Sequence, residues 1–250
     1  MSLVAIILAA GKGTRMASDL PKVLHPIDGT PLVMFPIEAA RAAGASQVVV
    51  VVGYEGDRVR EEVSKRLDDD SAWLSFATQE EQLGTGHAVM CGLPALGDAT
   101  GVALVLSGDV PLLTAETVQT LAKRCREVDS GVALTTFRPD ELTGYGRILR
   151  DEQGRVKCIR EDRDASEEER RVGECNAGTY AVQLEHLRAD LPRLGRNNAQ
   201  GEIYLTDLVE LAAERGEVAA VEIDPSEAAG VNTQEQLAEL EAVLIQRRQS

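Results

Sequence analysis

Short runs of β-branched and aliphatic residues alternate in the first half of the chain with longer stretches in which apolar residues recur every three or four positions. This alternation is typical of layered α/β folds. The runs are nearly continuous, as expected for parallel strands that helices cover on both faces. We predict strands at 3–8, 47–52, 73–77, 102–106 and 132–136. We predict helices at about 31–43, 56–67, 86–96 and 115–127.

Two residues carry local signals about where the predicted helices begin. Thr114 is expected to cap the helix that begins at residue 115, because its hydroxyl can accept from a free N–H of the first turn. Pro36 must lie in the opening turn of the first helix or kink it.

From about residue 137 the pattern changes to short strands, turns and charged stretches. Residues 146–150 and 155–160 predict a β-hairpin whose turn ends in Gly154. The charged stretch 161–171 predicts a loop or a short exposed helix, and a strand near 175–182, a helix near 203–215 and a strand at 218–223 follow. A final helix is expected after Thr233, because Thr233 and Gln236 have the spacing of a capping box.

Composition narrows the class of protein. The 250 residues are 44% hydrophobic and 27% charged, which excludes intrinsic disorder and a disulfide-stapled miniprotein. No apolar run approaches the ~20 residues needed to cross a bilayer, and the start lacks the basic region of a signal peptide, so we expect a soluble, cytoplasmic protein with no membrane partner. No repeat and no Pro/Ser-rich linker interrupts the chain, which predicts one compact domain.

Charge excludes further classes. Lys and Arg number 26 against 41 Asp and Glu, a net charge of −15, so we expect no nucleic-acid partner. The four cysteines and three histidines have no zinc-ligand spacing, which argues against a transition-metal site.

A glycine-rich turn follows the first predicted strand, at Gly11 and Gly13. Such turns at the carboxyl ends of strands let backbone N–H groups face a phosphate. The next residues contain a single acid, Asp19, and three cations, Lys12, Arg15 and Lys22. In so acidic a chain, this local basic cluster implies a polyanionic ligand. The spacing is not that of a Walker A loop, and a plain strand–loop turn is the alternative interpretation.

Two more segments carry candidate chemistry. Asp109 directly follows a buried strand and could hold Mg²⁺, which prefers one or two carboxylates plus phosphate oxygens; the alternative is an Asp that caps the turn before Pro111. The segment from Gln79 to Thr85 ends a strand in a polar turn whose amides suit a base edge, and His87 there is expected to be a packed or capping residue.

Other polar positions are weaker candidates. From the residues alone, Asn176 and Asn232 are most often turn residues. The acidic stretches 68–70 and 167–169 are expected to be solvated loops.

Seven motifs follow one another along nearly the whole chain. They are LAAGKGTRM (8–16), LPKVLH (20–25), EQLGTGHA (81–88), SGDVPL (107–112), TGYGRI (143–148), NNAQGEIYLTD (197–207) and GVNTQEQL (230–237). In this order they resemble the bacterial N-acetylglucosamine-1-phosphate uridyltransferase domains of the sugar-nucleotide pyrophosphorylase family.

The resemblance implies an α/β fold with a Rossmann-like, mixed but mostly parallel sheet flanked by helices, and a small β-rich substrate lobe. It implies a nucleotide-binding half at about 1–136, a sugar-binding half at about 137–232 and a C-terminal helix at 233–250, without the acetyltransferase β-helix domain of bifunctional relatives. The implied reaction is Mg²⁺-dependent transfer of UMP from UTP to N-acetylglucosamine 1-phosphate, which releases pyrophosphate.

Residue roles are carried over motif by motif. The resemblance implies that the nucleotide is lined by Leu8, Ala9, Ala10, Gly11, Gly108 and Asp109. It implies uracil contacts from Gln79, Gly84 and Thr85, and phosphate contacts from the catalytic cations Arg15 and Lys22. It implies sugar contacts from Gly144, Glu161, Asn176 and Asn232, and Mg²⁺ ligands from Asp109 and Asn232.

The chain departs from the family pattern on the sugar side. Ser107 stands where Tyr is usual, Ala177 where Thr is usual and Arg163 where Lys is usual, so the exact sugar stays open, as does the oligomeric state. Three alternatives remain: a pyrophosphorylase for another nucleotide or sugar, a non-catalytic UDP-sugar sensor, and a metal-dependent glycosyltransferase. The last would need an Asp-x-Asp after a strand, whereas residues 68–70 follow a predicted helix.

Overall fold

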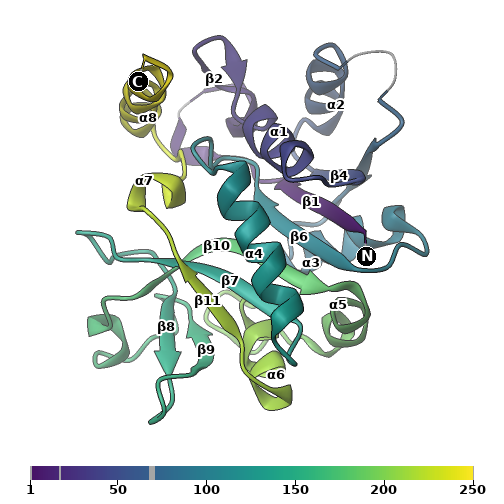
Figure 1. Cartoon of the computed structure of the whole chain (residues 1–250). Helices are drawn as coiled ribbons and strands as arrows, with labels where there is room; N and C mark the ends of the chain where they lie inside the picture. The colour runs from purple at the N-terminus through teal and green to yellow at the C-terminus, as the bar shows by residue number, and fades with distance from the viewer. Residues whose placement is uncertain (1, 17, 68–70, 250) are drawn as a thin grey trace.

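The computed structural model describes residues 2–16, 18–67 and 71–249 (Figure 1). Within these residues nine strands form one sheet, and the path through its centre runs β11-β7-β10-β6-β1-β4-β5. The acidic stretch 68–70 lies outside the described residues.

The strands are β1 (Leu3–Ala9), β2 (Pro26–Ile27), β3 (Thr30–Pro31), β4 (Gln47–Val52), β5 (Leu74–Thr78), β6 (Val102–Ser107), β7 (Val132–Phe137), β8 (Arg147–Arg150), β9 (Val156–Arg160), β10 (Cys175–Gln183) and β11 (Ala219–Glu222). The α-helices are α1 (Met34–Ala42), α2 (Gly56–Ser64), α3 (Thr85–Gly92), α4 (Ala115–Glu127), α5 (Leu184–Asp190), α6 (Asp207–Arg215), α7 (Pro225–Ala228) and α8 (Gln234–Gln249). Short 3₁₀ turns are η1 (Thr14–Met16), η2 (Lys22–Leu24), η3 (Leu93–Leu96), η4 (Glu169–Arg171) and η5 (Leu191–Arg193).

The sheet is mixed but mostly parallel, which confirms the expected fold class. Strand β1 pairs in parallel with β4 and β6, β4 with β5, and β11 with β7. Strand β10 is antiparallel to both β6 and β7, between which it lies. The β8–β9 hairpin joins the start of β10 through the pairing of Arg147 with Cys175.

Helices cover both faces of this sheet, as Figure 1 shows. From β1, Leu3, Ala5, Ile7 and Ala9 pack with α1, α2 and α4, whereas Val4 and Ile6 pack with α3, α5 and α6 on the other face. All five valines of β4 are at most 1% exposed. A continuous apolar run is therefore required here, because both faces of the strand are removed from water.

A separate apolar cluster fastens the C-terminal helix to the N-terminal half. In this cluster Leu240 of α8 packs with Met16, Ile27 and Leu32, so α8 lies on the β2–β3 hairpin and beside η1. Gln234 also donates from Nε2 to the Met16 carbonyl at 3.3 Å. The last helix of the chain thus contacts the glycine-rich segment that follows β1.

The predicted N-cap of α4 is confirmed in full, and the predicted capping box of α8 is confirmed in part. Thr114 accepts at Oγ1 from the Thr117 N–H at 3.2 Å, as an N-cap should. Thr233 accepts from the Gln236 N–H at 3.3 Å, but the Gln236 side chain accepts from the Asn232 N–H at 2.8 Å instead of completing the capping box on Thr233.

Several predicted boundaries were wrong. The first helix begins at Met34 rather than near 31, because residues 30–31 form β3, and this places Pro36 in its opening turn. The helix predicted at 86–96 is α-helical only to Gly92 and continues as a 3₁₀ turn, with Pro94 among its first residues. The helix predicted near 203 begins at Asp207. Among the described residues, no helix is both long enough and apolar enough to cross a membrane.

Candidate functional site

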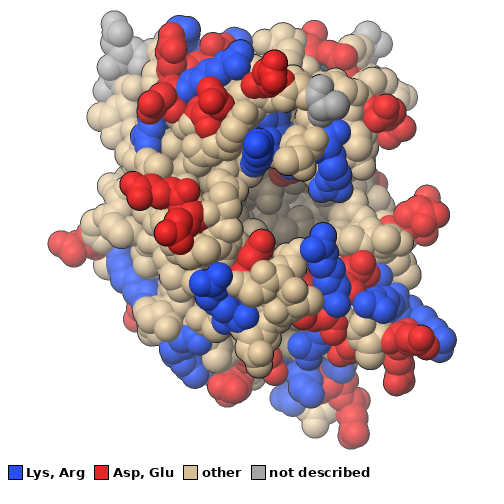
Figure 2. Space-filling model, turned by 180° about the vertical axis from the view of Figure 1, so that it is seen from behind, with Lys and Arg blue, Asp and Glu red and all other residues tan. Residues whose placement is uncertain are grey.

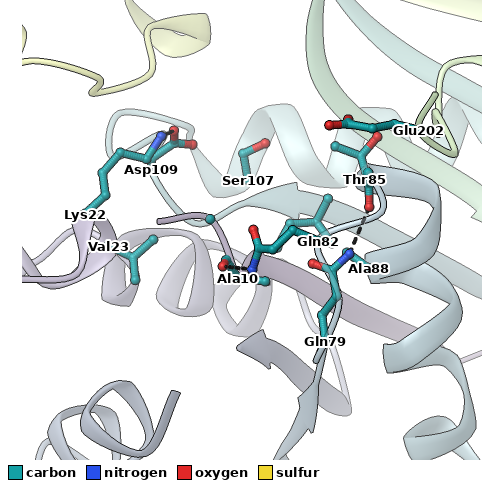
Figure 3. A pocket seen from close by; sticks show the side chains of 13 residues that line it. Ala10, Lys22, Val23, Gln79, Gln82, Thr85, Ala88, Ser107, Asp109 and Glu202 are labelled. Carbon is teal, nitrogen blue, oxygen red and sulfur yellow. Dashed lines mark hydrogen bonds and ion pairs between the residues drawn. The ribbon is translucent and has the colours of Figure 1, made fainter. Parts of the chain in front are cut away.

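A cavity of about 280 Å³ opens where β1 and β6 end. Eight residues expected at the nucleotide line it: Leu8, Ala10, Gly11, Lys22, Gln79, Gly84, Thr85 and Asp109. In Figure 3 Lys22 and Asp109 lie together at one end of the cavity, Gln79 and Thr85 lie at the other, and Ser107 points in between them. The cavity therefore has a charged end and an amide-lined end.

Two expected residues lie behind this cavity rather than on its wall. Ala9 is 2% exposed and packs in the core between the sheet and α1, α2 and α4. Gly108 is buried, and its N–H donates to the Leu8 carbonyl at 2.9 Å, which joins the ends of β6 and β1.

Glycine is required at position 13. Gly13 has φ +65°, and a Cβ there would lie 2.4 Å from Cβ of Lys22. Only glycine adopts this conformation without strain and leaves that space. The loop can therefore fold closely over Lys22, and the Gly13 carbonyl accepts from the Met16 N–H at 3.0 Å, which forms the 3₁₀ turn that carries Arg15.

Four polar side chains converge at the charged end. The Lys22 ammonium forms an ion pair with the Asp109 carboxylate and lies 3.2 Å from Oδ1 of Asn232. Nη2 of Arg15 donates to the same Oδ1 at 2.8 Å. The side chains of Lys22 and Asp109 are 15% and 19% exposed, so the pair is largely shielded from water.

The backbone brings Asn232 to this point from the far end of the chain. The Val231 N–H donates to the Asp109 carbonyl at 2.9 Å, and a Cβ on Gly230 would lie 3.7 Å from Oδ2 of Asp109. Gln236, in the first turn of α8, then accepts from the Asn232 N–H. Asn232 is thereby held on one side by the turn that follows β6 and on the other by α8.

Asp109 and Asn232 provide the oxygens that could hold a divalent cation. Within the part of the chain that the structure describes, no three His, Cys, Asp or Glu side chains gather as a metal site. One carboxylate and one amide oxygen nevertheless suit Mg²⁺, which keeps its other positions for phosphate oxygens and water.

The amide-lined end of the cavity depends on Gly84. Its φ is +105°, and a Cβ there would lie 2.6 Å from the Ile203 carbonyl oxygen. Oγ1 of Thr85 accepts a hydrogen bond from the backbone N–H of Leu205 at 3.0 Å. Gly84 and Thr85 therefore both lie against the segment that precedes α6. Gln79 is 4% exposed, and its Nε2 donates to the Gly84 carbonyl at 3.0 Å.

A second cavity of about 520 Å³ lies beside η1 and is lined by Thr14, Arg15, Gly144, Glu161, Asp162, Arg163, Gln200 and Tyr204. It brings together three of the residues expected near the phosphates or the sugar: Arg15, Gly144 and Glu161. Burial raises the pKa of Glu161 above its ordinary value, and a hydrogen bond from Oγ1 of Thr206 at 2.9 Å opposes that shift. Asn232, which bonds to Arg15 here and to Lys22 in the first cavity, lies between the two.

Asn176 lines neither cavity in this structure. Its Nδ2 donates to the Tyr180 hydroxyl at 2.7 Å, and its Oδ1 accepts from the Gly178 N–H at 3.0 Å, across an irregularity in the pairing of β10. A Cβ on Gly178 would lie 3.8 Å from Oγ of Ser107. This turn is therefore adjacent to the first cavity.

Two polar residues on the wall of the first cavity, Gln82 and Glu202, were given no individual role from the sequence. Gln82 donates from Nε2 to the Ala10 carbonyl at 2.6 Å, and Glu202 lines the cavity near Gly84. Both lie within motifs that were recognised. The amide of Gln82 belongs to the polar turn expected to suit a base edge, whereas nothing indicated a role for Glu202. His87 keeps Nδ1 3.2 Å from Nε2 of Gln79, consistent with a packed histidine.

Figure 2 shows the face that Figure 1 turns away from the viewer, and a hollow opens at its centre. Several Lys and Arg side chains stand on the rim of this hollow, together with an acidic side chain at its lower edge, and other acidic side chains are spread over the face. On a chain of net charge −15, this group of cations at a hollow favours an anionic ligand.

Residues 5–173 match the model of the MobA-like NTP transferase domain family. Over 245 residues the chain is 50% identical to the bifunctional protein GlmU of Trichlorobacter lovleyi, with 97% of this chain and 52% of the relative covered. It is 47% identical to the bifunctional protein GlmU of Anaeromyxobacter sp. strain K (98% and 50% covered) and to that of Pelobacter propionicus (98% and 53%). The chain thus spans about half the length of these curated relatives.

Proposed function

Because the chain belongs to the family of MobA-like NTP transferase domains, we propose that it transfers a nucleoside monophosphate from an NTP to the phosphate of a second substrate. The NTP in this proposal is UTP and the acceptor is N-acetylglucosamine 1-phosphate. The products are UDP-N-acetylglucosamine and pyrophosphate. The seven motifs support this choice, and they fall in the part of the bifunctional relatives that the chain matches.

One observation carries the proposal: two cavities meet at Arg15, Lys22, Asp109 and Asn232. Lys22 and Asp109 line the first cavity and Arg15 lines the second, while Asn232 bonds to both cations. A nucleotide with its base at Gln79 would direct its phosphates toward Lys22. A sugar 1-phosphate with its sugar at Glu161 would direct its phosphate toward Arg15.

This arrangement suits an in-line displacement. An oxygen of the sugar phosphate attacks the α-phosphorus of UTP, a new P–O bond forms, and the bond to the β-phosphate oxygen breaks. The attacking phosphate is already ionised at neutral pH, so no general base is required. The difficulty is that two anions must approach each other, and the cations Lys22 and Arg15 reduce that repulsion while they align the phosphates.

The residues at the junction fit Mg²⁺. Oxygens of Asp109 and Asn232 converge on one point, at which the Lys22 ammonium lies in this structure, so the position already favours positive charge. The Asp109 carboxylate and the Asn232 amide each provide a hard oxygen ligand, and these two side chains would hold the ion. When bound, Mg²⁺ supplies charge neutralisation at the phosphate oxygens. Asp109 and Asn232 orient it, and Gln236 and the Val231–Asp109 backbone bond fix their separation.

The proposal is tested by pyrophosphate release from UTP and Mg²⁺ with a panel of sugar 1-phosphates. We expect turnover with N-acetylglucosamine 1-phosphate to exceed that with glucose 1-phosphate, and Lys22→Ala to suppress it. Best turnover with GTP would overturn the choice of nucleotide. Binding of UDP-N-acetylglucosamine without turnover of any sugar 1-phosphate would instead support a sensor. The same panel answers whether Ser107 and Ala177 alter the sugar accepted.

A further inference from the structure

The amide of Gln79 is fixed in one orientation by two contacts. Its Nε2 lies 3.0 Å from the Gly84 carbonyl oxygen and 3.2 Å from Nδ1 of His87; Figure 3 shows the first contact. A backbone carbonyl can only accept hydrogen bonds, so the NH₂ half of the amide must face Gly84. His87 then receives the second hydrogen of the same NH₂ group.

This geometry also fixes the tautomer of His87. Because Nδ1 accepts from Gln79, the neutral ring carries its proton on Nε2. Nε2 lies 3.7 Å from Sγ of Cys91, one turn further along α3, and sulfur is a weak acceptor. The donors thus run from Gln79 through His87 to Cys91, while the other N–H of Gln79 is donated to the Gly84 carbonyl.

These two contacts determine which atom of Gln79 is left for a ligand in the cavity. Both N–H bonds of Gln79 are used within the protein, and Oε1 has no partner among the described residues. Gln79 lines the first cavity, so the group left for a ligand is an acceptor. Uracil and thymine carry an N–H donor at N3, whereas cytosine carries an acceptor there. An acceptor held against cytosine N3 would leave two lone pairs facing each other.

We infer that His87 is a positioning residue that holds the Gln79 amide with Oε1 toward the nucleotide, and so makes the site select a base with N3–H over cytosine. The inference rests on the proposed function and specifies its nucleotide further. Without the His87 acceptor, one of the two contacts that orient the amide is lost, while the Gly84 carbonyl still favours the same orientation. The loss of one such hydrogen bond corresponds to about a tenfold change.

The test measures UTP and CTP binding by isothermal titration calorimetry, with Mg²⁺ and without any sugar 1-phosphate. We compare wild type with His87→Leu, which removes the acceptor, and His87→Asn, whose Oδ1 stands in for Nδ1. His186→Leu, at the start of α5 and outside both cavities, is the matched control. The ratio of UTP to CTP affinity should fall about tenfold in His87→Leu and stay unchanged in the other two variants.

An unchanged ratio in His87→Leu would overturn the inference, as would an equal fall in His87→Asn. Failure of wild type to bind either nucleotide would overturn the proposed function as well, whereas UTP binding with an unaltered ratio leaves that function standing. A second measurement does not depend on the variants being folded. In the ¹⁵N spectrum of wild type, Nδ1 of His87 should be unprotonated, and a proton on Nδ1 would refute the proposed chain of donors.

Discussion

Oδ1 of Asn232 accepts a hydrogen bond from Nη2 of Arg15 at 2.8 Å, although 217 positions separate the two residues in the chain. The same oxygen lies 3.2 Å from Nζ of Lys22. One amide therefore joins the cation of the second cavity to the cation of the first. The catalytic proposal depends on this junction, and four predictions follow from its parts and surroundings.

Lys22→Ala should lower kcat about 10²–10³-fold, or roughly 3–4 kcal/mol of barrier, by analogy with other preorganised electrostatic groups. Lys22 lies at the junction of the cavities, so we expect its charge to matter most where negative charge is concentrated, in the transition state. KM for UTP should change less than kcat. Steady-state kinetics with UTP as the varied substrate measures both.

Lys157→Ala is the matched control, because Lys157 is an exposed lysine of β9 that lines neither cavity of the junction. It should leave both constants unchanged. A rise in KM for UTP with kcat intact in Lys22→Ala would show that Lys22 binds the ground state only.

Asp109→Asn should raise the Mg²⁺ concentration needed for half-maximal activity and lower turnover, because it removes the carboxylate from the proposed ligand pair. The fold should persist, since the backbone carbonyl of Asp109 still accepts from the Val231 N–H. Mg²⁺ titrations of activity, with circular dichroism as a check on the fold, measure the two effects. An unchanged Mg²⁺ dependence would remove Asp109 from the ligand set.

Gln236→Leu should weaken Mg²⁺ binding, although Gln236 is not itself a proposed ligand. Gln236 accepts from the Asn232 N–H at 2.8 Å, and the loss of an outer-shell partner typically costs 10–100-fold in metal affinity. We expect at least about a tenfold loss of Mg²⁺ affinity in the presence of UTP, measured by calorimetry. Gln236→Glu keeps an acceptor oxygen and should restore the affinity. If both variants bind Mg²⁺ like wild type, α8 does not position Asn232.

Local patterns predicted much of this fold. The valine run of β4 and the cap at Thr114 depend on residues close in sequence, and both are found as expected. The placement of β10 between β6 and β7 depends on pairing between distant segments, which local periodicity does not encode. Tyr204 falls within the helix predicted near 203–215 but lies before α6 begins, because residues 203–205 bond to Leu83 and Thr85 instead.

The residues of the site also divide into those that nearby sequence predicts and those whose position depends on contacts between distant segments. Glycine spacing and local charge alone predicted that the loop of Gly13 and Lys22 faces an anionic ligand, and the structure packs Gly13 against Lys22 at the cavity. Asn232 could not, because by itself it is typical of a turn, and only the Val231–Asp109 backbone bond places it beside the carboxylate. Gln82 was expected only as one amide of the polar turn at 79–85, and Glu202 was not expected at all, so their exact position on the cavity wall depends on the folded chain.

The last prediction concerns pH and the pair of Glu161 and Thr206. Burial raises the pKa of Glu161, and the Thr206 hydroxyl, which donates at 2.9 Å, favours the ionised form and limits that rise. If ionised Glu161 holds the sugar, binding of the sugar 1-phosphate weakens as pH falls through this pKa. Thr206→Val removes the donor with little change in shape, so the pKa should rise further and the acid limb of kcat/KM for the sugar 1-phosphate should move to higher pH. Thr206→Ser keeps the hydroxyl and should leave the limb where it is in wild type. A limb that does not move in Thr206→Val would show that another group sets it.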